Sequence, residues 1–297
     1  MKIRIGTRGS DLAMSQARYA AERIEGVTEI VVIKTKGDNI QNVSFDKMEG
    51  KGFFTKEIEE ALLEGRIDLA VHSLKDLPTE SSAGLTIAAV PAREDAADVM
   101  LVRKEKESAA LPFPLAEGAV VGTSSVRRLA QLKCNRHDLE VKALRGNVNT
   151  RLRRLREGLY DAIILAAAGL KRLEYDFSEF SARVIPVDVM LPAPGQGALA
   201  LQVREDDTAV REAAARLHDH DSFLCVSAER AFLKEFGGGC HIPLGALALI
   251  TPEGISLDGL IASPDGSVIY RSTVTGTDPA EVGAKLAEVI RKKGGQV

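Results

Sequence analysis

The sequence predicts two doubly wound α/β units followed by a small α+β unit. Short apolar runs alternate with helical patterns through the first two-thirds of the chain. This alternation restarts after the segment PAREDAAD, and the last part changes to a long helix, three strands and a closing helix. A length of 297 residues is enough for two or three domains.

The first unit contains four predicted strands. KIRIGT is the first, and the helix behind it is expected to have Ser10 as its N-cap. EIVVIKT is the second strand, followed by the helix TKEIEEALLEG with Thr55 as cap and Gly65 as stop. IDLAVHSL and LTIAAVP complete a pattern typical of a parallel or mixed sheet with helices on both faces.

The second unit, from about Asp98 to Asp188, repeats strand–helix pairs and is a candidate for a related half. The pairs are AVVGTS with SVRRLAQLKC, LEVKALR with NVNTRLRRLREG, and DAIILAAAG with GLKRL. The segment MLPAPGQGALALQV then predicts a crossing back. Its Pro and Gly residues suit a hinge, and GALALQV is expected to add a strand to the first sheet.

The third unit begins with the long amphipathic helix DSFLCVSAERAFLKEF. ALALI, ISLDGLIAS and SVIYRSTVTG predict strands, with PDG as a hairpin turn. A closing helix is expected to have Asp278 at the N-cap and Pro279 at its first position. The predicted domains are residues 1–97 with 191–217, residues 98–190, and residues 218–297.

Composition indicates a globular protein of the cytoplasm. Hydrophobic residues make up 45% and charged residues 27%, and the net charge is -3. We expect no membrane partner, because no apolar run reaches spanning length and the N-terminus lacks the apolar core of a signal peptide. Three cysteines do not make a disulfide framework.

Positive charge gathers in one segment of this acidic protein. Between Gly122 and Arg172, nine arginines and three lysines give twelve positive charges against four acidic residues, a balance of +8. A solvated helix face explains Arg153, Arg154 and Arg156. For the remainder, an anion-binding cleft is the functional interpretation.

Three turns share one design, in which a strand runs into a Thr, Ser or Gly turn with arginine and then a helix. They are IGTRGS, VGTSSVRR and LRGNVNTR. Helix N-termini and arginine forks both bind carboxylates or phosphates, although Ser and Thr also cap helices for structural reasons alone. The glycine spacing fits no Walker loop or dinucleotide fingerprint, so no nucleotide cofactor is indicated.

The strand IDLAVHSL is followed by Lys75, Asp76 and a proline. This is either a charged surface turn or a carboxylate that faces the anion cleft. In the cleft, Asp76 could stabilise a cationic intermediate or transfer protons. His72, earlier on the same strand, is interpreted as a packed residue rather than a catalytic one.

The stretch FGGGCHIPLG places Cys240 behind three glycines. Metal binding with His241 lacks ligand spacing, and a nucleophilic cysteine needs a base that sequence does not locate. In a third interpretation, the glycines let the backbone approach a bulky group and leave the sulfur accessible. Cys225, in contrast, lies in an apolar helix stripe.

With these residues assembled, the chain closely resembles the porphobilinogen deaminase (hydroxymethylbilane synthase) family. The matching stretches occur in family order from the first strand to the third unit: GTRGSDLAMSQ, DKMEGKGFFTKEIEEALL, DLAVHSLKDLPT, GTSSVRRLAQL, LRGNVNTRL, AAAGLKRL, LPAPGQGALAL and ERAFLKEFGGGCHIPLGAL. The resemblance implies that the two α/β units are similar to type II periplasmic-binding-protein domains.

The resemblance also implies an activity and a cofactor. Enzymes of this family are transferases that join four porphobilinogen molecules head to tail, with loss of ammonia, to give hydroxymethylbilane for tetrapyrrole (haem-type) biosynthesis. Their dipyrromethane cofactor is bound by a thioether to the cysteine that matches Cys240, and the glycines would make room for its ring. The family implies a monomer without metal, nucleotide or nucleic acid.

The family's functional residues match positions in this sequence. The catalytic aspartate matches Asp76. The cofactor-binding residues match Cys240, Lys75, Asp76, Thr123, Ser124, Ser125, Arg127, Arg128 and Arg145. The substrate-binding residues match Arg8, Ser10, Lys47, Lys51, Phe54, Arg151 and Arg172, and the loop 38–52 is a candidate mobile lid. One departure is Gln202, where many family members have glutamate.

Two other functions compete with this interpretation. A hinged pair of α/β units with an anion cleft also describes solute-binding proteins, but these are usually exported and have no use for Cys240. Nucleic-acid binding through the basic segment is the other alternative. Tyr160 is the only aromatic residue there, which argues against base stacking.

Overall fold

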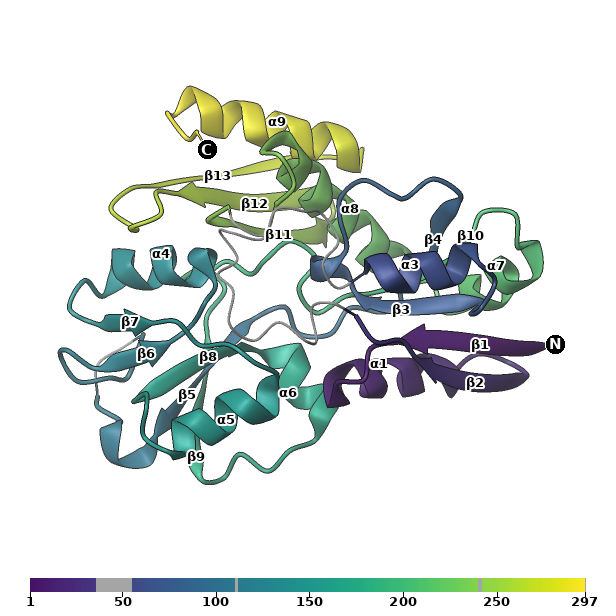
Figure 1. Cartoon of the computed structure of the whole chain (residues 1–297). Coiled ribbons are helices and arrows are strands. Elements are labelled where there is room, and N and C mark those ends of the chain that lie inside the picture. The colour runs from purple at the N-terminus through teal and green to yellow at the C-terminus, as the bar shows by residue number, and fades with distance from the viewer. Residues whose placement is uncertain (36–54, 110–111, 240–241, 297) are drawn as a thin grey trace.

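The computed structural model describes residues 1–35, 55–109, 112–239 and 242–296 (Figure 1). The predictions for Lys47, Lys51, Phe54 and the loop 38–52 lie outside these described residues, as do those for Cys240 and His241. Three sheets are present in the described chain, and each belongs to one of three units arranged around a common centre (Figure 1).

The first sheet has the strand order β2-β1-β3-β10-β4. Its strands are β1 (Lys2–Thr7), β2 (Val27–Val32), β3 (Leu69–Ser73), β4 (Leu85–Ala89) and β10 (Leu199–Arg204). β1 pairs in parallel with β2 and β3, whereas β10 pairs antiparallel with β3 and β4. The predicted return of GALALQV to the first sheet is therefore confirmed.

The second sheet has the order β7-β6-β8-β5-β9. Its strands are β5 (Asp98–Arg103), β6 (Val120–Gly122), β7 (Glu140–Lys142), β8 (Ala162–Ala166) and β9 (Phe180–Ile185). β5 pairs antiparallel with β8 and β9. β5 and β9 are absent from the elements that the sequence predicts. The sequence of β5, DVMLVR, directly follows the acidic segment PAREDAAD, which obscures the start of this strand.

The two α/β sheets are related halves. In each sheet, three parallel strands are followed by a fourth strand, β10 or β5, that is antiparallel to both of its neighbours. The same local contact recurs in both: Asp68 accepts the Arg4 N–H, and Asp161 accepts the Val120 N–H, each at 2.9 Å. We propose the domain bounds 1–97 with 191–217, 98–190, and 218–297 on this arrangement.

Five helices on these sheets were predicted from the sequence: α1 (Asp11–Ala21), α3 (Lys56–Leu63), α4 (Val126–Asn135), α5 (Val148–Arg156) and α6 (Ala167–Leu173). A sixth, α7 (Thr208–Ala215), follows β10 and was not predicted. Ser10 caps α1, and its Oγ accepts the Ala13 N–H at 3.3 Å. Gly65 follows α3 with φ +68°, the left-handed stop that was expected. Thr55 holds the N-cap position of α3, but within the described residues its side chain accepts no capping hydrogen bond.

The third unit packs two helices on a three-stranded sheet (Figure 1). The order β11-β12-β13 is antiparallel throughout, and Asp278 caps the last helix at the Glu281 N–H. Its elements are α8 (His220–Glu235), β11 (Leu244–Thr251), β12 (Gly254–Ala262), β13 (Ile269–Gly276) and α9 (Pro279–Lys292). Phe232, Leu257 and Leu286 are fully buried at its centre, so burial of apolar side chains holds the helices to the sheet.

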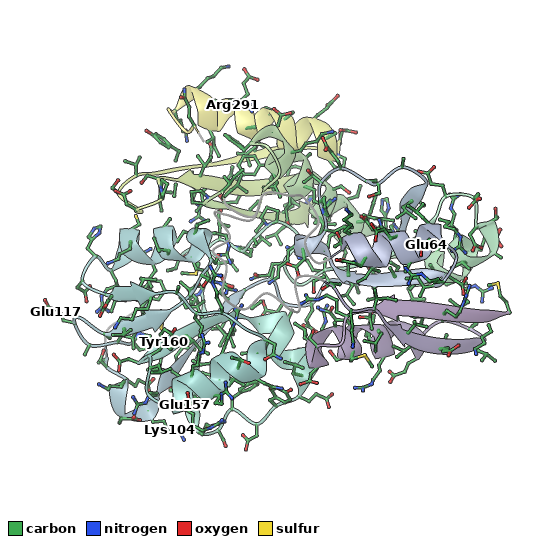
Figure 2. The ribbon with its side chains drawn as sticks, viewed as in Figure 1. Glu64, Lys104, Glu117, Glu157, Tyr160 and Arg291 are labelled. Atoms are coloured by element: carbon green, nitrogen blue, oxygen red, sulfur yellow. The ribbon has the colours of Figure 1, made fainter. Side chains whose placement is uncertain are left out.

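Charged side chains divide into two groups. Glu64, Lys104 and Glu117 lie at the periphery, exposed to solvent (Figure 2). Glu229 on α8 is instead fully buried, and Arg93 donates to it through two nitrogens at 2.6 and 3.0 Å. The same carboxylate accepts the Gly195 N–H at 2.7 Å and the Ala248 N–H at 2.9 Å. Glu229 therefore joins the third unit to both segments that cross between the α/β units.

We expect Glu229→Ala to lower the free energy of unfolding by about 3–5 kcal/mol, because it leaves the Arg93 charge buried without its partner. Urea denaturation checks this value. Glu235→Ala is the matched control on the same helix, since Glu235 pairs with Arg291 at the surface, and it should change stability by less than about 1 kcal/mol. Equal effects of the two substitutions would contradict the structural role of Glu229.

Candidate functional site

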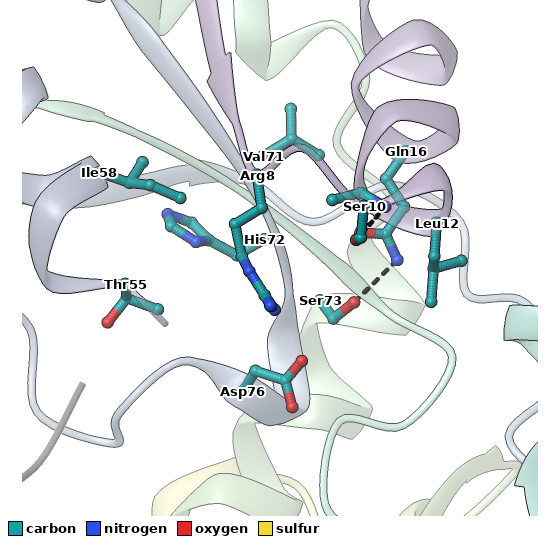
Figure 3. Close-up of a pocket in the computed structure, with 11 residues that line it drawn as sticks. Arg8, Ser10, Leu12, Gln16, Thr55, Ile58, Val71, His72, Ser73 and Asp76 are labelled. Carbon is teal, nitrogen blue, oxygen red and sulfur yellow. Dashed lines mark hydrogen bonds between the residues drawn. The ribbon is translucent and has the colours of Figure 1, made fainter. Parts of the chain in front are cut away.

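A small pocket of 70 Å³ lies where β1 and β3 end. Its lining comes from the turn after β1 and the first half of α1, from β3 and the turn behind it, and from the start of α3. The residues used below are Arg8, Ser10, His72 and Asp76. In Figure 3 the Arg8 side chain extends toward the Asp76 carboxylate. Because the strands are parallel, their carboxyl ends bring these residues together.

Asp76 belongs to a single 3₁₀ turn, Leu74–Asp76, directly behind β3. Leu74 is buried, and its N–H donates to the Ala198 carbonyl at 3.0 Å, so the return segment fixes the turn. The Asp76 side chain is exposed and lines the pocket. A carboxylate in this position is open to a ligand and anchored to the sheet at the same time.

Lys75 connects this turn to the segment that crosses back from the second unit to the first. Its amine donates to Gln196 Oε1 at 3.3 Å. Burial lowers the pKa of Lys75 from 10.5 to about 8, against the raising effect of Asp76 and Asp98, while Arg128 and Arg127 lower it further. Lys75 is therefore a cation at neutral pH that lies close to other cations, an arrangement that favours a bound anion.

His72 lies on β3 beside the pocket and is buried. Its Nε2 is 3.0 Å from Gln202 Oε1, and Gln202 Nε2 donates to Glu59 at 2.9 Å. Burial lowers the pKa of His72 to about 4, so the ring is neutral at physiological pH. A neutral ring bonded within the sheet suits the interpretation of His72 as a packed residue.

Arg127 and Arg128, in the first turn of α4, are buried rather than open to solvent. Arg128 donates to Asp98 Oδ1 through Nε at 3.1 Å and Nη2 at 2.7 Å, and Arg127 Nη1 lies 2.8 Å from Asp98 Oδ2. Burial alone would raise the pKa of Asp98, but the two guanidinium groups outweigh it and hold that pKa well below its usual range. The resemblance implies that both arginines bind carboxylates of the cofactor. In the structure, the internal carboxylate of Asp98 lies between them.

The hydroxyl groups after β6 organise their own turn. Thr123 Oγ1 accepts the Ser125 N–H at 3.2 Å, Ser124 Oγ donates to the Leu144 carbonyl at 3.0 Å, and Ser125 caps α4. Each hydroxyl oxygen keeps capacity for a further hydrogen bond. The turn is thus preformed at the start of α4, where unpaired N–H groups favour an anion.

Three further predicted arginines come from the second unit. Arg151 donates to the Gly146 carbonyl at 2.8 Å, and burial, aided by Arg128 and opposed by Asp76, lowers its pKa to about 10. Arg172 donates to the Gly197 carbonyl at 2.7 Å, in the second crossing segment. Arg145 is half-buried in the turn behind β7. Arg151 and Lys75, from different units, therefore both lie within electrostatic reach of Asp76 and Arg128.

The glycines before Cys240 border this site, although Cys240 itself is outside the described residues. Gly237 and Gly238 have φ values of +89° and +71°, which L side chains rarely adopt. A Cβ on Gly238 would lie 2.5 Å from Thr79 Oγ1, so Gly238 packs closely against a residue three positions after Asp76. Arg230 on α8 also donates to the Leu77 and Pro78 carbonyls at 3.0 and 2.6 Å. The glycine loop is thereby held beside the Lys75–Asp76 turn.

Sequence reasoning missed Asp98 and Gln196. Asp98 stands at the start of the unrecognised strand β5, and Gln196 lies in the hinge segment APGQG. A fully buried acid between two arginines has no local signature, since its partners are distant in sequence. Among the described residues, no cluster of three His, Cys, Asp or Glu could hold a metal ion, and no helix is long and apolar enough to cross a membrane.

Two family models match the chain. One, described as porphobilinogen deaminase, dipyromethane cofactor binding domain, matches residues 3–212, and the other, described as porphobilinogen deaminase, C-terminal domain, matches residues 223–292. Relatives named porphobilinogen deaminase align over nearly their whole length. The Brevibacillus brevis protein is 44% identical over 99% of this chain and 95% of its own. The Syntrophomonas wolfei protein is 46% identical over 99% and 96%.

The solved structures that match the chain are distant in sequence. The VFT2 domain of Bordetella pertussis BvgS, as a double mutant, has a TM-score of 0.42 with 14% identity, over 73% of this chain and 85% of that one. An arginine-specific periplasmic binding protein of Salmonella typhimurium has a TM-score of 0.39 with 12% identity, over 75% of this chain and 93% of that one.

Proposed function

The chain belongs to the porphobilinogen deaminase family, and from that premise we propose that its dipyrromethane cofactor is attached to Cys240 by a thioether and held by cations of both α/β units. The protein is a transferase that polymerises porphobilinogen to hydroxymethylbilane in tetrapyrrole biosynthesis. Its first 212 residues include the cofactor-binding domain of this family. The attachment atom and the roles of individual residues are the proposal.

One observation supports the placement most directly. Gly238, two residues before Cys240, packs against Thr79, which follows the Lys75–Asp76 turn. A group attached to Cys240 would therefore start beside Asp76 and near the cations of the second unit. A dipyrromethane has acetate and propionate side chains on each ring, and the donor set around the turn consists of the groups that bind carboxylates.

The cations divide naturally between two roles. The cofactor acids would be bound by four cations and three hydroxyl groups: Lys75, Arg127, Arg128, Arg145, Thr123, Ser124 and Ser125. Arg8, Ser10, Arg151 and Arg172 would bind the incoming substrate, and Lys47, Lys51 and Phe54 belong to the same proposal although they lie outside the described residues. The whole protein remains acidic, at net charge -3, because 42 Asp and Glu residues outnumber 39 Lys and Arg residues.

Asp76 would act where charge develops in the reaction. The bound dipyrromethane supplies an electron-rich ring carbon that forms the new carbon–carbon bond. When ammonia leaves the aminomethyl group of porphobilinogen, a cationic azafulvene remains, and the Asp76 carboxylate would accept hydrogen bonds from the pyrrole N–H and stabilise that cation. The same carboxylate would also accept the proton released when the ring carbon is substituted.

The lowered pKa of Lys75 predicts an alkaline limit on turnover, because Lys75 would hold the cofactor to which the substrate is added. Below pH 8 the amine is a cation that binds carboxylate, and as pH rises through about 8 it loses this charge. We expect kcat/KM of the wild type to fall relative to that of Lys75→Arg as pH rises from about 7 to about 9.5, because arginine stays protonated throughout. The ratio of the two profiles cancels titration of the substrate, and a ratio independent of pH would contradict the assignment.

We also propose that the protein is a cytoplasmic monomer that binds no nucleic acid. The basic face of α5 supports the last point, because two of its arginines are already paired with acidic residues. Arg153 lies 3.7 Å from Glu157, and Arg156 pairs with Glu179. These pairs favour a solvated helix face, and binding of duplex DNA that weakens with salt would contradict the proposal.

A further inference from the structure

We propose that Asp98 is a positioning residue of the cofactor site, which holds Arg127 and Arg128 directly, and Lys75 through Gln196, in the places from which they bind the cofactor acids. This inference depends on the proposed function of those cations. Asp98 itself would touch neither cofactor nor substrate, because it is fully buried.

Both carboxylate oxygens of Asp98 are engaged by cations of α4. Oδ1 accepts from Arg128 Nε and Nη2 at 3.1 and 2.7 Å, and Oδ2 lies 2.8 Å from Arg127 Nη1. Arg128 Nη1 donates to the Ile164 carbonyl at 2.9 Å, and Arg127 Nη1 to the Leu191 carbonyl at 2.6 Å. Asp98 and the Ile164 carbonyl together fix the orientation of the Arg128 guanidinium. Asp98 and the Leu191 carbonyl do the same for Arg127.

Gln196 connects Asp98 to Lys75 of the first unit. Its Nε2 donates to Asp98 Oδ1 at 2.9 Å and to the Ala96 carbonyl at 2.7 Å, which orients the amide so that Oε1 faces the Lys75 amine at 3.3 Å. Asp98 ends the first crossing segment and Gln196 lies in the second. The network therefore ties both crossings to the Lys75–Asp76 turn.

The charges of the cluster leave a role for a ligand. Two carboxylates, those of Asp76 and Asp98, lie among three cations, Lys75, Arg127 and Arg128, so positive charge is in excess before any anion binds. Within the described residues, the buried Arg127 Nε has no hydrogen-bond partner. The cluster therefore carries net positive charge, and it holds cations in place while the Arg127 Nε donor remains unused.

A second buried acid provides the matched control. Asp68 also serves two arginines: Arg4 donates to it through Nε at 2.9 Å and Nη2 at 2.7 Å, and Arg204 Nη2 lies at 3.4 Å. Asp68 precedes β3, so it lies at the opposite end of that strand from the Asp76 turn. Its loss should weaken the fold without reaching the cofactor site.

The test compares full-length wild type, Asp98→Ala, Asp98→Asn and Asp68→Ala, each made in cells that cannot supply porphobilinogen. Each chain is then incubated with porphobilinogen, and its intact mass is followed with time. We expect the Asp98 variants to acquire the cofactor mass about tenfold more slowly or worse, since each loses charge-assisted hydrogen bonds. Formate should restore part of the rate to Asp98→Ala, because it can occupy the space of the missing carboxylate. Asp68→Ala should load at the wild-type rate although it unfolds at a lower temperature.

The outcomes separate the two proposals. If wild type never gains the mass, the attachment at Cys240 is wrong. If wild type gains it and the Asp98 variants load as fast as Asp68→Ala, or if formate gives no rescue, the positioning role alone is wrong. Should the Asp98 variants fail to fold, Gln196→Leu decides, because it keeps the Asp98–arginine pairs and removes the amide that links Asp98 and the Ala96 carbonyl to Lys75. Slowed loading of Gln196→Leu supports the inference, and an unchanged rate overturns it.

Discussion

Replacement of Cys240 by serine is expected to abolish hydroxymethylbilane production, with a loss of roughly a thousandfold or more. A thiolate is a strong nucleophile near neutral pH, whereas a serine hydroxyl without an activating base is not. The cofactor then has no covalent anchor, and the growing chain has no fixed end from which to extend. Steady-state production of hydroxymethylbilane measures the effect.

The other two cysteines are built-in controls. Cys225 is buried on α8, and burial raises the pKa of its thiol to about 11, so it is an unreactive core residue. Cys134 is exposed on α4. Cys225→Ser and Cys134→Ser should both retain turnover within a factor of about three, apart from any loss of stability. If Cys134→Ser lost turnover and Cys240→Ser retained it, the cofactor would be attached to Cys134 on α4 instead.

Asp76→Asn is expected to lower kcat by roughly a hundred- to a thousandfold while the fold and the attached cofactor are retained. Asparagine keeps the shape and one oxygen of the side chain but removes the negative charge that would stabilise the substrate cation. Rapid-quench measurement of each elongation step, alongside intact mass and thermal unfolding, distinguishes a loss of chemistry from a loss of structure.

Asp206→Asn is the matched control for this substitution. Asp206 is an exposed acid in the turn behind β10, and β10 runs antiparallel to β3. It therefore lies at the far end of the first sheet from Asp76, and its replacement should leave turnover unchanged. If Asp76→Asn behaved like Asp206→Asn, Asp76 would be a surface turn residue without a role in the chemistry.

Much of the fold was predictable because its signals are local. Ser10 before α1 and Asp278 before α9 are caps that side-chain chemistry dictates. The return of GALALQV to the first sheet followed from a hinge composition and an apolar run. The strand β5 was not predicted because it begins with Asp98, an acidic residue that continues the polar segment before it. The burial of Asp98 depends on partners that are distant in sequence.

The interior of the site was less predictable for a physical reason. Arg127 and Arg128 were identified as cations of the cleft, but their orientation depends on Asp98, thirty residues earlier. Gln196 lies a further 98 residues from Asp98. Such contacts arise only when α4, β5 and the second crossing segment meet in three dimensions. Sequence patterns identify the charge that a site collects, and the fold decides which charges face the ligand and which hold the others in place.

The intact mass of the purified protein tests the central claim most directly. A chain with its dipyrromethane on Cys240 should be heavier than its sequence by two pyrrole units, and the Cys240→Ser chain should have the mass of its sequence alone. Fragment masses should place the addition on the peptide that contains residues 237–242. A fully active wild-type protein with the unmodified mass, or an addition that persists in Cys240→Ser, would contradict the account.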